Sequence, residues 1–285
     1  MLEVKNITKK YDNKEVLKDV SFDVKNGEIV TILGKNGAGK TTILNSILKM
    51  IKIDSGEIIF DERNIFSLKN KQYFKDVSAV LESSVNVYNY LTGMENIEYF
   101  CGLSNIDLNK KENKDLVYKY AKLFKLEDDL YKKVDFYSRG MQQKLAIIIA
   151  LVVKPKLLLL DEPTLGLDIE SKWTMIDFIK KVVKENNISI ILTTHQIEIV
   201  RSLNSRVVLL KDGKSYEYEL IDFLTGFKDE YIITYIDDYN NLVTKKTDCS
   251  IKEIIEKYKD YDIKEIRKVD MDIEKIVMEK LNESN

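Results

Sequence analysis

A glycine-rich segment joins an apolar run to a helical pattern and reads Gly34-Lys35-Asn36-Gly37-Ala38-Gly39-Lys40-Thr41-Thr42. It fits the pattern G-x-x-x-x-G-K-S/T, which is typical of loops that bind phosphate groups. The apolar run 29–33 predicts a buried strand before the loop, and residues 43–48 predict a helix after it. An ordinary glycine-rich turn is the alternative, and the flanking strand and helix favour the phosphate loop over it.

The residue types in this loop suit phosphate chemistry. Its glycines allow backbone dihedrals that turn N–H groups inward, and they have no Cβ to block phosphate oxygens. The N-terminal end of the following helix adds a favourable dipole. The Lys40 ammonium can reach the outer phosphates of a nucleotide, and the Thr41 hydroxyl can bind Mg²⁺. We therefore predict a nucleotide phosphate site over residues 34–42.

Composition limits the class of protein. The 285 residues are 44% hydrophobic, which is enough for one large domain with an appendage or for two small domains. Charged residues make up 32% but nearly cancel, and a formal net charge of -2 gives no general attraction to nucleic acid or anionic lipid. We therefore expect no nucleic-acid partner.

Cysteine usage and hydropathy predict a cytoplasmic chain. Cys101 and Cys249 form no C-x-x-C pair, so we expect neither a metal knuckle nor a disulfide framework, and a reducing cytosol fits. The longest uninterrupted apolar run, 145–153, is about half as long as a membrane-spanning helix. The first residues lack the basic and apolar blocks of a signal peptide.

The alternation of apolar and polar residues predicts two kinds of sheet. Short β patterns in residues 1–33, separated by turn residues, predict a small antiparallel sheet, and a further β pattern follows at 55–60. Near-continuous apolar runs separated by helical patterns predict parallel strands that are covered on both faces. These runs span residues 77–81, 157–160, 188–194 and 207–210.

A helical block, residues 83–135, interrupts the β patterns and predicts a helical subdomain inserted in the α/β core. A capping box at 92–95 opens one helix, and the helical period gives that helix an apolar face. The predicted face carries Ile97, Phe100 and Leu103.

Residues 1–215 form the predicted main domain, and residues 216–285 form a C-terminal accessory α/β segment. In this segment we expect a hairpin at 231–244, a capped helix from Ser250 to about Tyr258, a strand at 263–269 and a helix at 273–281. We expect the segment to pack against the core or against another subunit.

Further polar residues follow predicted strands, at the edge where parallel sheets bind ligands. Asp161 can hold Mg²⁺ through water, and Glu162 can take a proton from an attacking water. His195, the only histidine, ends another strand. Tyr11 lies near a turn, where its ring can stack on a base. The alternatives are an ordinary acidic turn, a packed histidine and a structural tyrosine.

One further stretch connects these features to a family. Tyr137-Ser138-Arg139-Gly140-Met141 resembles the signature sequence of ATP-binding cassettes, the nucleotide-binding subunits of ABC transporters. The resemblance covers residues 1–215, because the other motifs stand in the order and spacing of the family. These motifs are the loop at 34–42, the run 157–164 with both carboxylates, Gly166-Leu167-Asp168 and Thr193-Thr194-His195.

The resemblance implies a P-loop NTPase cassette with an antiparallel β subdomain, a parallel-sheet core and an inserted helical subdomain. It also implies ATP hydrolysis coupled to transport, with ATP and Mg²⁺ bound. Tyr11 would stack on adenine, and Lys40 with the backbone of the loop would hold the phosphates. Thr41 and Asp161 would hold the metal.

The resemblance also implies partners. In the cassette's own site, Glu162 would be the catalytic base and His195 would contact the γ-phosphate. In the family two cassettes face each other head to tail. Ser138 and the N–H of Gly140 would contact the γ-phosphate bound by a second cassette, in a homodimer or related heterodimer, and Asp168 would cross the interface. An integral membrane permease would hold the chain at the inner face of the membrane.

Two departures from the family pattern matter. Arg139 and Met141 replace the commoner glycine and glutamine of the signature. Glu82 stands where cassettes usually carry a glutamine that senses Mg²⁺, so we expect its carboxylate at the metal site. The stretches 80–82, 90–97 and 137–141 resemble cassettes of bacterial exporters that move drugs, antimicrobial peptides or ions.

Three other functions compete with an exporter subunit. An importer subunit of the same family is one alternative. A soluble cassette ATPase acting on nucleic acid or ribosomes usually has two cassettes in one chain, a long coiled-coil insertion or a basic stripe, and this sequence has none of them. A non-catalytic, nucleotide-gated scaffold is opposed by the intact Asp161, Glu162 and His195.

Overall fold

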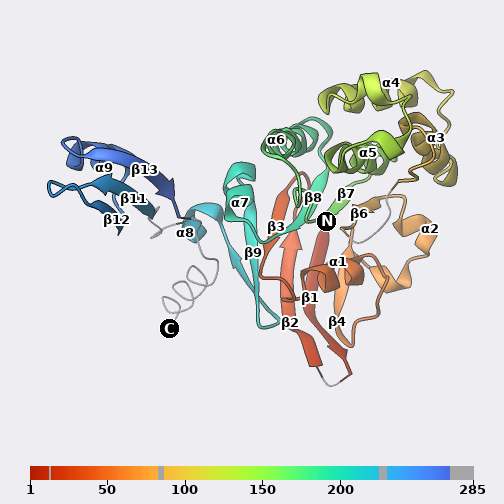
Figure 1. The fold of residues 1–285 in the computed structure, drawn as a ribbon. Coiled ribbons are helices and arrows are strands. Elements are labelled where there is room, and N and C mark those ends of the chain that lie inside the picture. Colours follow the sequence, from red (N-terminus) through yellow and green to blue (C-terminus); the bar gives the residue numbers. More distant parts are fainter. Residues whose placement is uncertain (13, 83–86, 225–229, 270–285) are drawn as a thin grey trace. The chain divides into compact units, whose positions relative to one another are not determined.

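The computed structural model describes residues 1–12, 14–82, 87–224 and 230–269, and the helix expected at 273–281 lies outside these ranges. The chain divides into two compact units, Met1–Leu220 and Ile221–Asn285 (Figure 1). The expected boundary after residue 215 falls inside a strand, β10 (Lys214–Tyr218), which pairs with the core sheet. The first unit therefore extends past that strand.

The first unit begins with a four-stranded antiparallel sheet in the order β2-β1-β4-β5. Its strands are β1 (Leu2–Tyr11), β2 (Lys14–Val24), β4 (Ser55–Phe60) and β5 (Arg63–Asn64). The sheet agrees with the expectation, but β1 is longer than its alternating pattern. Register shifts interrupt that pattern, and Asn6 adopts a left-handed φ of 50° within the strand.

The core sheet has six strands in the order β10-β9-β3-β8-β7-β6. The strands β3 (Ile29–Leu33), β6 (Val77–Val80), β7 (Leu157–Asp161), β8 (Ser189–Thr194) and β9 (Arg206–Lys211) are parallel to their neighbours in this set. Only the edge strand β10 runs antiparallel. Because β3, β8 and β7 are adjacent, the segments that follow their carboxyl ends lie side by side.

Two hydrophobic cores cover the faces of this sheet. In β7, Leu158 and Leu160 belong to a core shared with the helical subdomain, whereas Leu157 and Leu159 belong to a core shared with the antiparallel sheet. Successive side chains of a strand point to opposite faces, so a strand that is buried on both sides is apolar throughout. This packing explains the continuous leucine run of β7.

The helices of the first unit surround these cores. They are α1 (Lys40–Ile47), α2 (Asn70–Tyr73), α3 (Gly93–Leu103), α4 (Lys111–Leu123), α5 (Arg139–Val152), α6 (Ile169–Asn186) and α7 (Ile197–Leu203), with short 3-10 turns at 65–67, 127–129 and 134–136. Helices α3 and α4 both pack on α5 and form the helical subdomain (Figure 1). Within the described ranges, every helix is too short or too polar to cross a bilayer.

The capping box predicted at 92–95 is confirmed, because the Glu95 N–H donates to Thr92 Oγ1 and the Thr92 N–H donates to the Glu95 carboxylate. The predicted apolar face of α3 is partly wrong. Ile97 is buried, but Leu103 is 64% exposed, and Cys101 takes its place in the core. Leu103, in the last turn of α3, faces solvent because tertiary contacts decide which side of the helix packs against the core.

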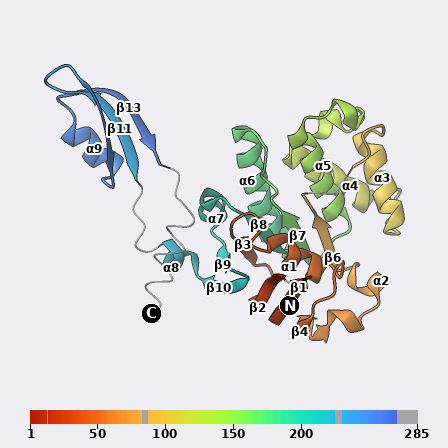
Figure 2. The ribbon, with the colours of Figure 1, turned by 60° about the horizontal axis from the view of Figure 1, so that its bottom comes forward.

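The second unit contains a three-stranded antiparallel sheet in the order β12-β11-β13. Its strands are β11 (Tyr231–Ile236), β12 (Leu242–Thr247) and β13 (Asp262–Lys268), and its helices are α8 (Leu220–Leu224) and α9 (Ile251–Lys257). Figure 2 shows α9 beside the sheet, and Ile254 of α9 shares a core with Ile233 and Tyr235 of β11. The hairpin, the capped helix and the third strand agree with the expectation.

Candidate functional site

The glycine-rich loop connects the central strand β3 to α1, which begins at Lys40. Gly37 and Gly39 have positive φ values of 80° and 107°, which other residues rarely adopt. A Cβ at Gly39 would lie 2.9 Å from Leu17 Cδ2. The loop therefore has the strand-to-helix context and the backbone conformation that a phosphate site needs.

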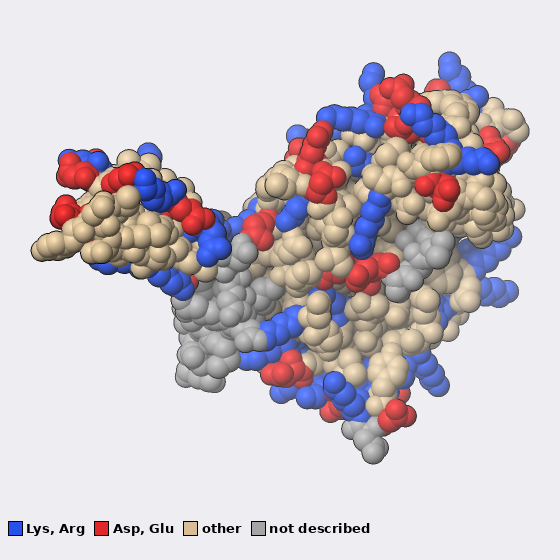
Figure 3. All heavy atoms as spheres, viewed as in Figure 1, with Lys and Arg blue, Asp and Glu red and all other residues tan. Residues whose placement is uncertain are grey.

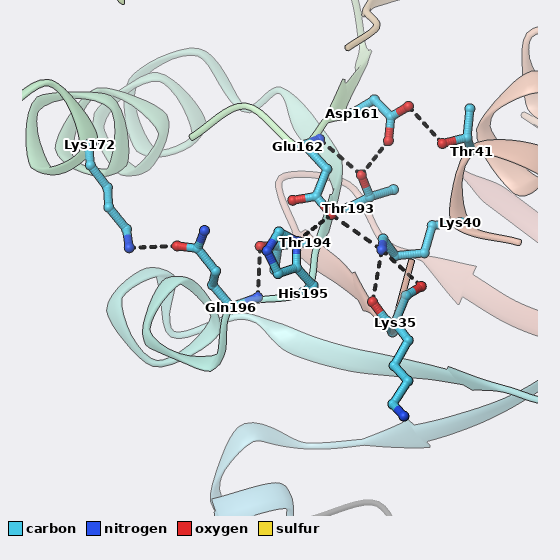
Figure 4. A network of polar contacts seen from close by, with 11 residues as sticks. Lys35, Lys40, Thr41, Asp161, Glu162, Lys172, Thr193, Thr194, His195 and Gln196 are labelled. Atoms are coloured by element: carbon cyan, nitrogen blue, oxygen red, sulfur yellow. Dashed lines mark hydrogen bonds and ion pairs between the residues drawn. The ribbon is translucent and has the colours of Figure 1, made fainter. Parts of the chain in front are cut away.

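Lys40 holds the loop from inside. Its side chain is buried, and Nζ donates to the carbonyl oxygens of Gly34 at 2.8 Å and Lys35 at 3.2 Å. Nζ also forms an ion pair with Glu162 Oε1 at 3.2 Å, as Figure 4 shows. A buried ammonium thus lies between the phosphate loop and the carboxylate of Glu162, the residue that follows β7.

Asp161 ends β7 and is fixed by two hydroxyl groups. Thr41 Oγ1 donates to Asp161 Oδ2 at 2.9 Å, and Thr193 Oγ1 donates to Asp161 Oδ1 at 2.5 Å. Thr193 Oγ1 also accepts the N–H of Glu162 at 3.0 Å, so one hydroxyl of β8 orients both carboxylate residues (Figure 4). Sequence analysis named Thr193 within the motif at 193–195 but gave its hydroxyl no role. The available signal was a hydroxyl residue at the end of an apolar strand.

Glu162 and His195 form the other half of this network. Glu162 is buried with a left-handed φ of 46°, and its Oε1 lies 3.0 Å from His195 Nδ1. An ionised carboxylate only accepts, so the imidazole donates from Nδ1 in this contact. Among the described residues, Glu162 Oε2 is buried and has no hydrogen-bond partner. A buried unpaired oxygen is costly, and functional sites are where such oxygens are retained.

These residues surround a cavity of about 440 Å³. Most of the loop lines it, together with residues from four other segments. The lining residues are Val16, Lys35, Asn36, Gly37, Gly39, Lys40, Thr41, Thr42, Glu82, Asp161, Glu162, Leu165 and His195. Gly34 and Ala38 belong to the loop but not to this lining. Sequence analysis missed Val16, because an apolar residue in a β pattern carries no signal of a ligand site.

Glu82 lies where a second cavity begins. That cavity, of about 340 Å³, shares Glu82, Asp161, Glu162 and Leu165 with the first. Its remaining wall includes polar side chains from the start of α5, among them Arg139. Glu82 therefore lines the same two cavities as Asp161 and Glu162, and its place at a metal ion stays a prediction.

The oxygen donors in the first cavity fit Mg²⁺. Thr41 Oγ1 and Asp161 Oδ2 lie 2.9 Å apart, and magnesium prefers a hydroxyl and a carboxylate, with phosphate oxygens and water completing its shell. Among the described residues, no group of three or more histidine, cysteine, aspartate or glutamate residues could hold a metal. The site suits an ion that a nucleotide brings with it.

Other predicted site residues lie away from this cavity. Ser138 is the N-cap of α5 and accepts the Met141 N–H at 3.2 Å. Asp168 caps α6 and accepts from the N–H and the hydroxyl of Ser171, and these bonds hold the pKa of its carboxyl below the usual value. A Cβ at Gly140 would lie 3.1 Å from Ser171 Oγ. The starts of α5 and α6 therefore meet in a second cluster.

Tyr11, at the end of β1, does not line the cavity. Its ring is 44% exposed, and Lys9 Nζ lies 5.3 Å from the ring centroid. The exposed ring is available for stacking, and its contact with a base stays a prediction. On the face that Figure 3 shows, basic and acidic side chains are interspersed.

The fold and the site define a nucleotide-binding protein of the phosphate-loop class, with two carboxylates and a histidine at the strand ends beside the loop. Comparison with protein families specifies the class further. The model of the ABC transporter family matches residues 17–165, which is over half of the chain. The chain therefore belongs to the ABC transporter family.

Known relatives agree with this assignment. The spermidine/putrescine import ATP-binding protein PotA of Mycoplasma mycoides is 38% identical over 218 residues, which are 75% of this chain and 59% of PotA. The uncharacterized ABC transporter ATP-binding protein YhcH of Bacillus subtilis is 32% identical over 235 residues, 81% of this chain and 72% of YhcH. The chain thus spans less than two thirds of the length of PotA.

A solved structure shares the fold. The ATP-binding cassette MJ0796, as a dimer in a post-hydrolysis state bound to ADP and Pi, matches with a TM-score of 0.68 and 30% identity. The match covers 77% of this chain and 99% of that one. The expected cassette fold, with antiparallel and parallel sheets and inserted helices, is confirmed.

Proposed function

We propose that this chain binds and hydrolyses ATP and thereby drives an ABC transporter. The observation that carries the proposal is the network around the first cavity, where Lys40, Asp161, Glu162 and His195 meet at the phosphate loop. Positioning and charge stabilisation are the main tasks in phosphoryl transfer, and this network supplies both.

The chain's own residues define the roles in hydrolysis. Lys40 and the loop N–H groups bind the outer phosphates of ATP. Thr41 and Asp161 would hold Mg²⁺, which when bound neutralises phosphate charge. Glu162 takes a proton from the attacking water, and its unpaired Oε2 is the acceptor for that proton. His195 holds Oε1 of the same carboxylate through Nδ1 and keeps the base oriented.

We propose that two cassettes complete each other's sites. Ser138, Gly140 and Asp168 do not line the first cavity of their own chain, and the side chains of Ser138 and Asp168 are exposed. The exposed Ser138 and the start of α5 present an N-terminal helix dipole to an anion. The dimeric structure of the MJ0796 cassette supports a pair of cassettes.

The proposed membrane partner is an integral permease that docks on the helical subdomain. An aromatic cluster there supports this proposal: Tyr88 contacts Tyr90, Tyr99 and Phe100, with ring centroids 5.1–5.9 Å apart. Tyr90 is 70% exposed and Tyr99 is 44% exposed. Contiguous exposed aromatic surface is typical of protein interaction sites. Docking would place the cassette at the inner face of the membrane.

Two directions of transport are proposed. Export is the direction that the sequence stretches resemble, and import is the direction in the name of the PotA relative. Purification of the chain from its own cells in mild detergent, followed by identification of the copurifying membrane protein, distinguishes them through the class of that permease.

Steady-state ATP turnover tests the proposed activity. The wild-type chain should hydrolyse ATP in a Mg²⁺-dependent reaction, and Glu162→Gln should lower kcat by about 100-fold or more because the general base is lost. The matched control is Glu57→Gln, which removes an exposed carboxylate on β4. Full turnover in Glu162→Gln would contradict the assigned base.

A further inference from the structure

One contact in Figure 4 links two parts of the chain that have different tasks. Lys172, in the first turn of α6, donates from Nζ to Gln196 Oε1 at 2.6 Å. Gln196 is the residue after His195 and the N-cap of α7. Both side chains of this pair are partly buried. The bond therefore joins the start of one helix to the segment that carries the histidine.

The helix end of this link lies in the cluster at the starts of α5 and α6. The Lys172 N–H donates to the Asp168 carbonyl oxygen at 2.9 Å, so Lys172 lies one turn after the cap residue. Ser171, between them, bonds the Asp168 carboxylate and lies against Gly140. A movement of this cluster moves the Lys172 backbone with it.

The other end of the link lies in the cavity. The Gln196 N–H donates to Thr194 Oγ1 at 3.1 Å, which holds the segment just past β8. His195, between these two residues, contacts Glu162 Oε1 at 3.0 Å. His195 has no regular secondary structure around it, because β8 ends at Thr194 and α7 begins at Ile197. Its position therefore depends on the side-chain contacts of its neighbours.

We propose that Lys172 is a positioning residue that holds His195 in place through Gln196, and so connects the cluster at Asp168 to the carboxylate of Glu162. The proposal rests on the function proposed above, in which Asp168 faces a second cassette and Glu162 serves the chain's own nucleotide. Through Lys172, the orientation of the Glu162 carboxylate then depends on the position of the cluster at Asp168, which faces the second cassette.

Spatial proximity alone does not establish such a connection, so the test has to measure coupling. His195 is the only histidine in the chain, and its ring gives a single set of ¹H–¹⁵N correlations in an NMR spectrum. These signals report the surroundings of the ring without any ATP turnover. The readout is therefore independent of the proposed activity.

The variants are Lys172→Met, which keeps the aliphatic stem and removes the donor, and Lys172→Arg, which keeps a donor. Lys180→Met is the matched control, because Lys180 is an exposed lysine on the same helix. We expect Lys172→Met to shift the His195 ring signals and to lower kcat about three- to tenfold with KM for ATP within about twofold. Lys172→Arg should restore most of both, and Lys180→Met should match the wild type.

A double-mutant cycle with Gln196→Ala completes the test. Because both substitutions remove the same bond, Lys172→Met should have little further effect on the ring signals or on kcat in the Gln196→Ala background. Wild-type ring signals and kcat in Lys172→Met, or independent effects of the two substitutions, would overturn the proposal. A wild-type chain without ATP turnover would contradict the proposed function instead, and the NMR comparison would still decide the role of Lys172.

Discussion

Thr193→Val is the substitution that most directly probes how the two carboxylates are held. The valine keeps the branched shape of this fully buried side chain and removes its hydroxyl group. The hydrogen bond to ionised Asp161 is lost, at about 1.5–3 kcal/mol, and the Glu162 N–H loses its acceptor, at about 1–3 kcal/mol. The more favourable burial of a methyl group offsets part of this cost.

We therefore expect the free energy of unfolding to fall by about 3 kcal/mol, which corresponds to roughly 6–12 °C in Tm for a unit of this size. Thermal unfolding followed by circular dichroism measures this change. Because both carboxylate residues lose their orientation, kcat for ATP should also fall by about tenfold or more. A change of this size in both quantities identifies Thr193 as a support of the site.

The matched control is Thr31→Val. Thr31 is also fully buried, and among the described residues its hydroxyl bonds the uncharged Ser205 Oγ, at 2.6 Å. This variant should lose about 1 kcal/mol and keep its turnover. The reasoning is refuted if Thr193→Val melts within about 2 °C of Thr31→Val and keeps kcat within about twofold of the wild type.

Three further predictions concern separate parts of the chain. Glu82→Gln removes a negative charge beside Asp161 and Glu162 and should change the ATPase rate or its Mg²⁺ dependence by at least about a few fold. Unchanged kinetics would place this side chain outside the site. Tyr73→Phe removes a hydrogen bond of 2.8 Å to the Ile47 carbonyl oxygen at the end of α1. This variant should lower the free energy of unfolding by about 1 kcal/mol, measured by thermal unfolding, and should leave ATP affinity unchanged in a nucleotide titration. Burial raises the pKa of the Cys101 thiol to about 11, so this thiol stays protonated near pH 8. Iodoacetamide should therefore modify Cys249 first. Peptide mass spectrometry that showed early modification of Cys101 would contradict this prediction.

Sequence analysis predicted the features that depend on local pattern. The loop at 34–42, the capping box at 92–95 and the carboxyl ends that carry Asp161 and His195 all follow from residue type and strand periodicity. Parallel strands place their carboxyl ends on one edge, so the meeting of these residues could be inferred without coordinates. In the second unit, a turn between two β patterns predicted the hairpin, and the capping residues 250–253 predicted the helix.

The features that sequence analysis missed depend on packing between distant segments. Leu103 fits the helical period of α3, but tertiary contacts turn it to solvent. Thr193 bonds both carboxylate residues because β7 and β8 pair with Asp161 opposite Thr193, and this register is not a local property. The bond between Lys172 and Gln196 joins two helix starts and has no signal in the order of residues.

The central claim is that the cavity at the phosphate loop is completed by a second cassette when ATP binds. The most direct test is the molar mass of Glu162→Gln with and without MgATP, measured by size-exclusion chromatography with light scattering. Because this variant keeps the phosphate loop and lacks the base, it should be monomeric without nucleotide and should double its mass with ATP. A variant that stays monomeric with ATP while keeping full turnover would contradict the account.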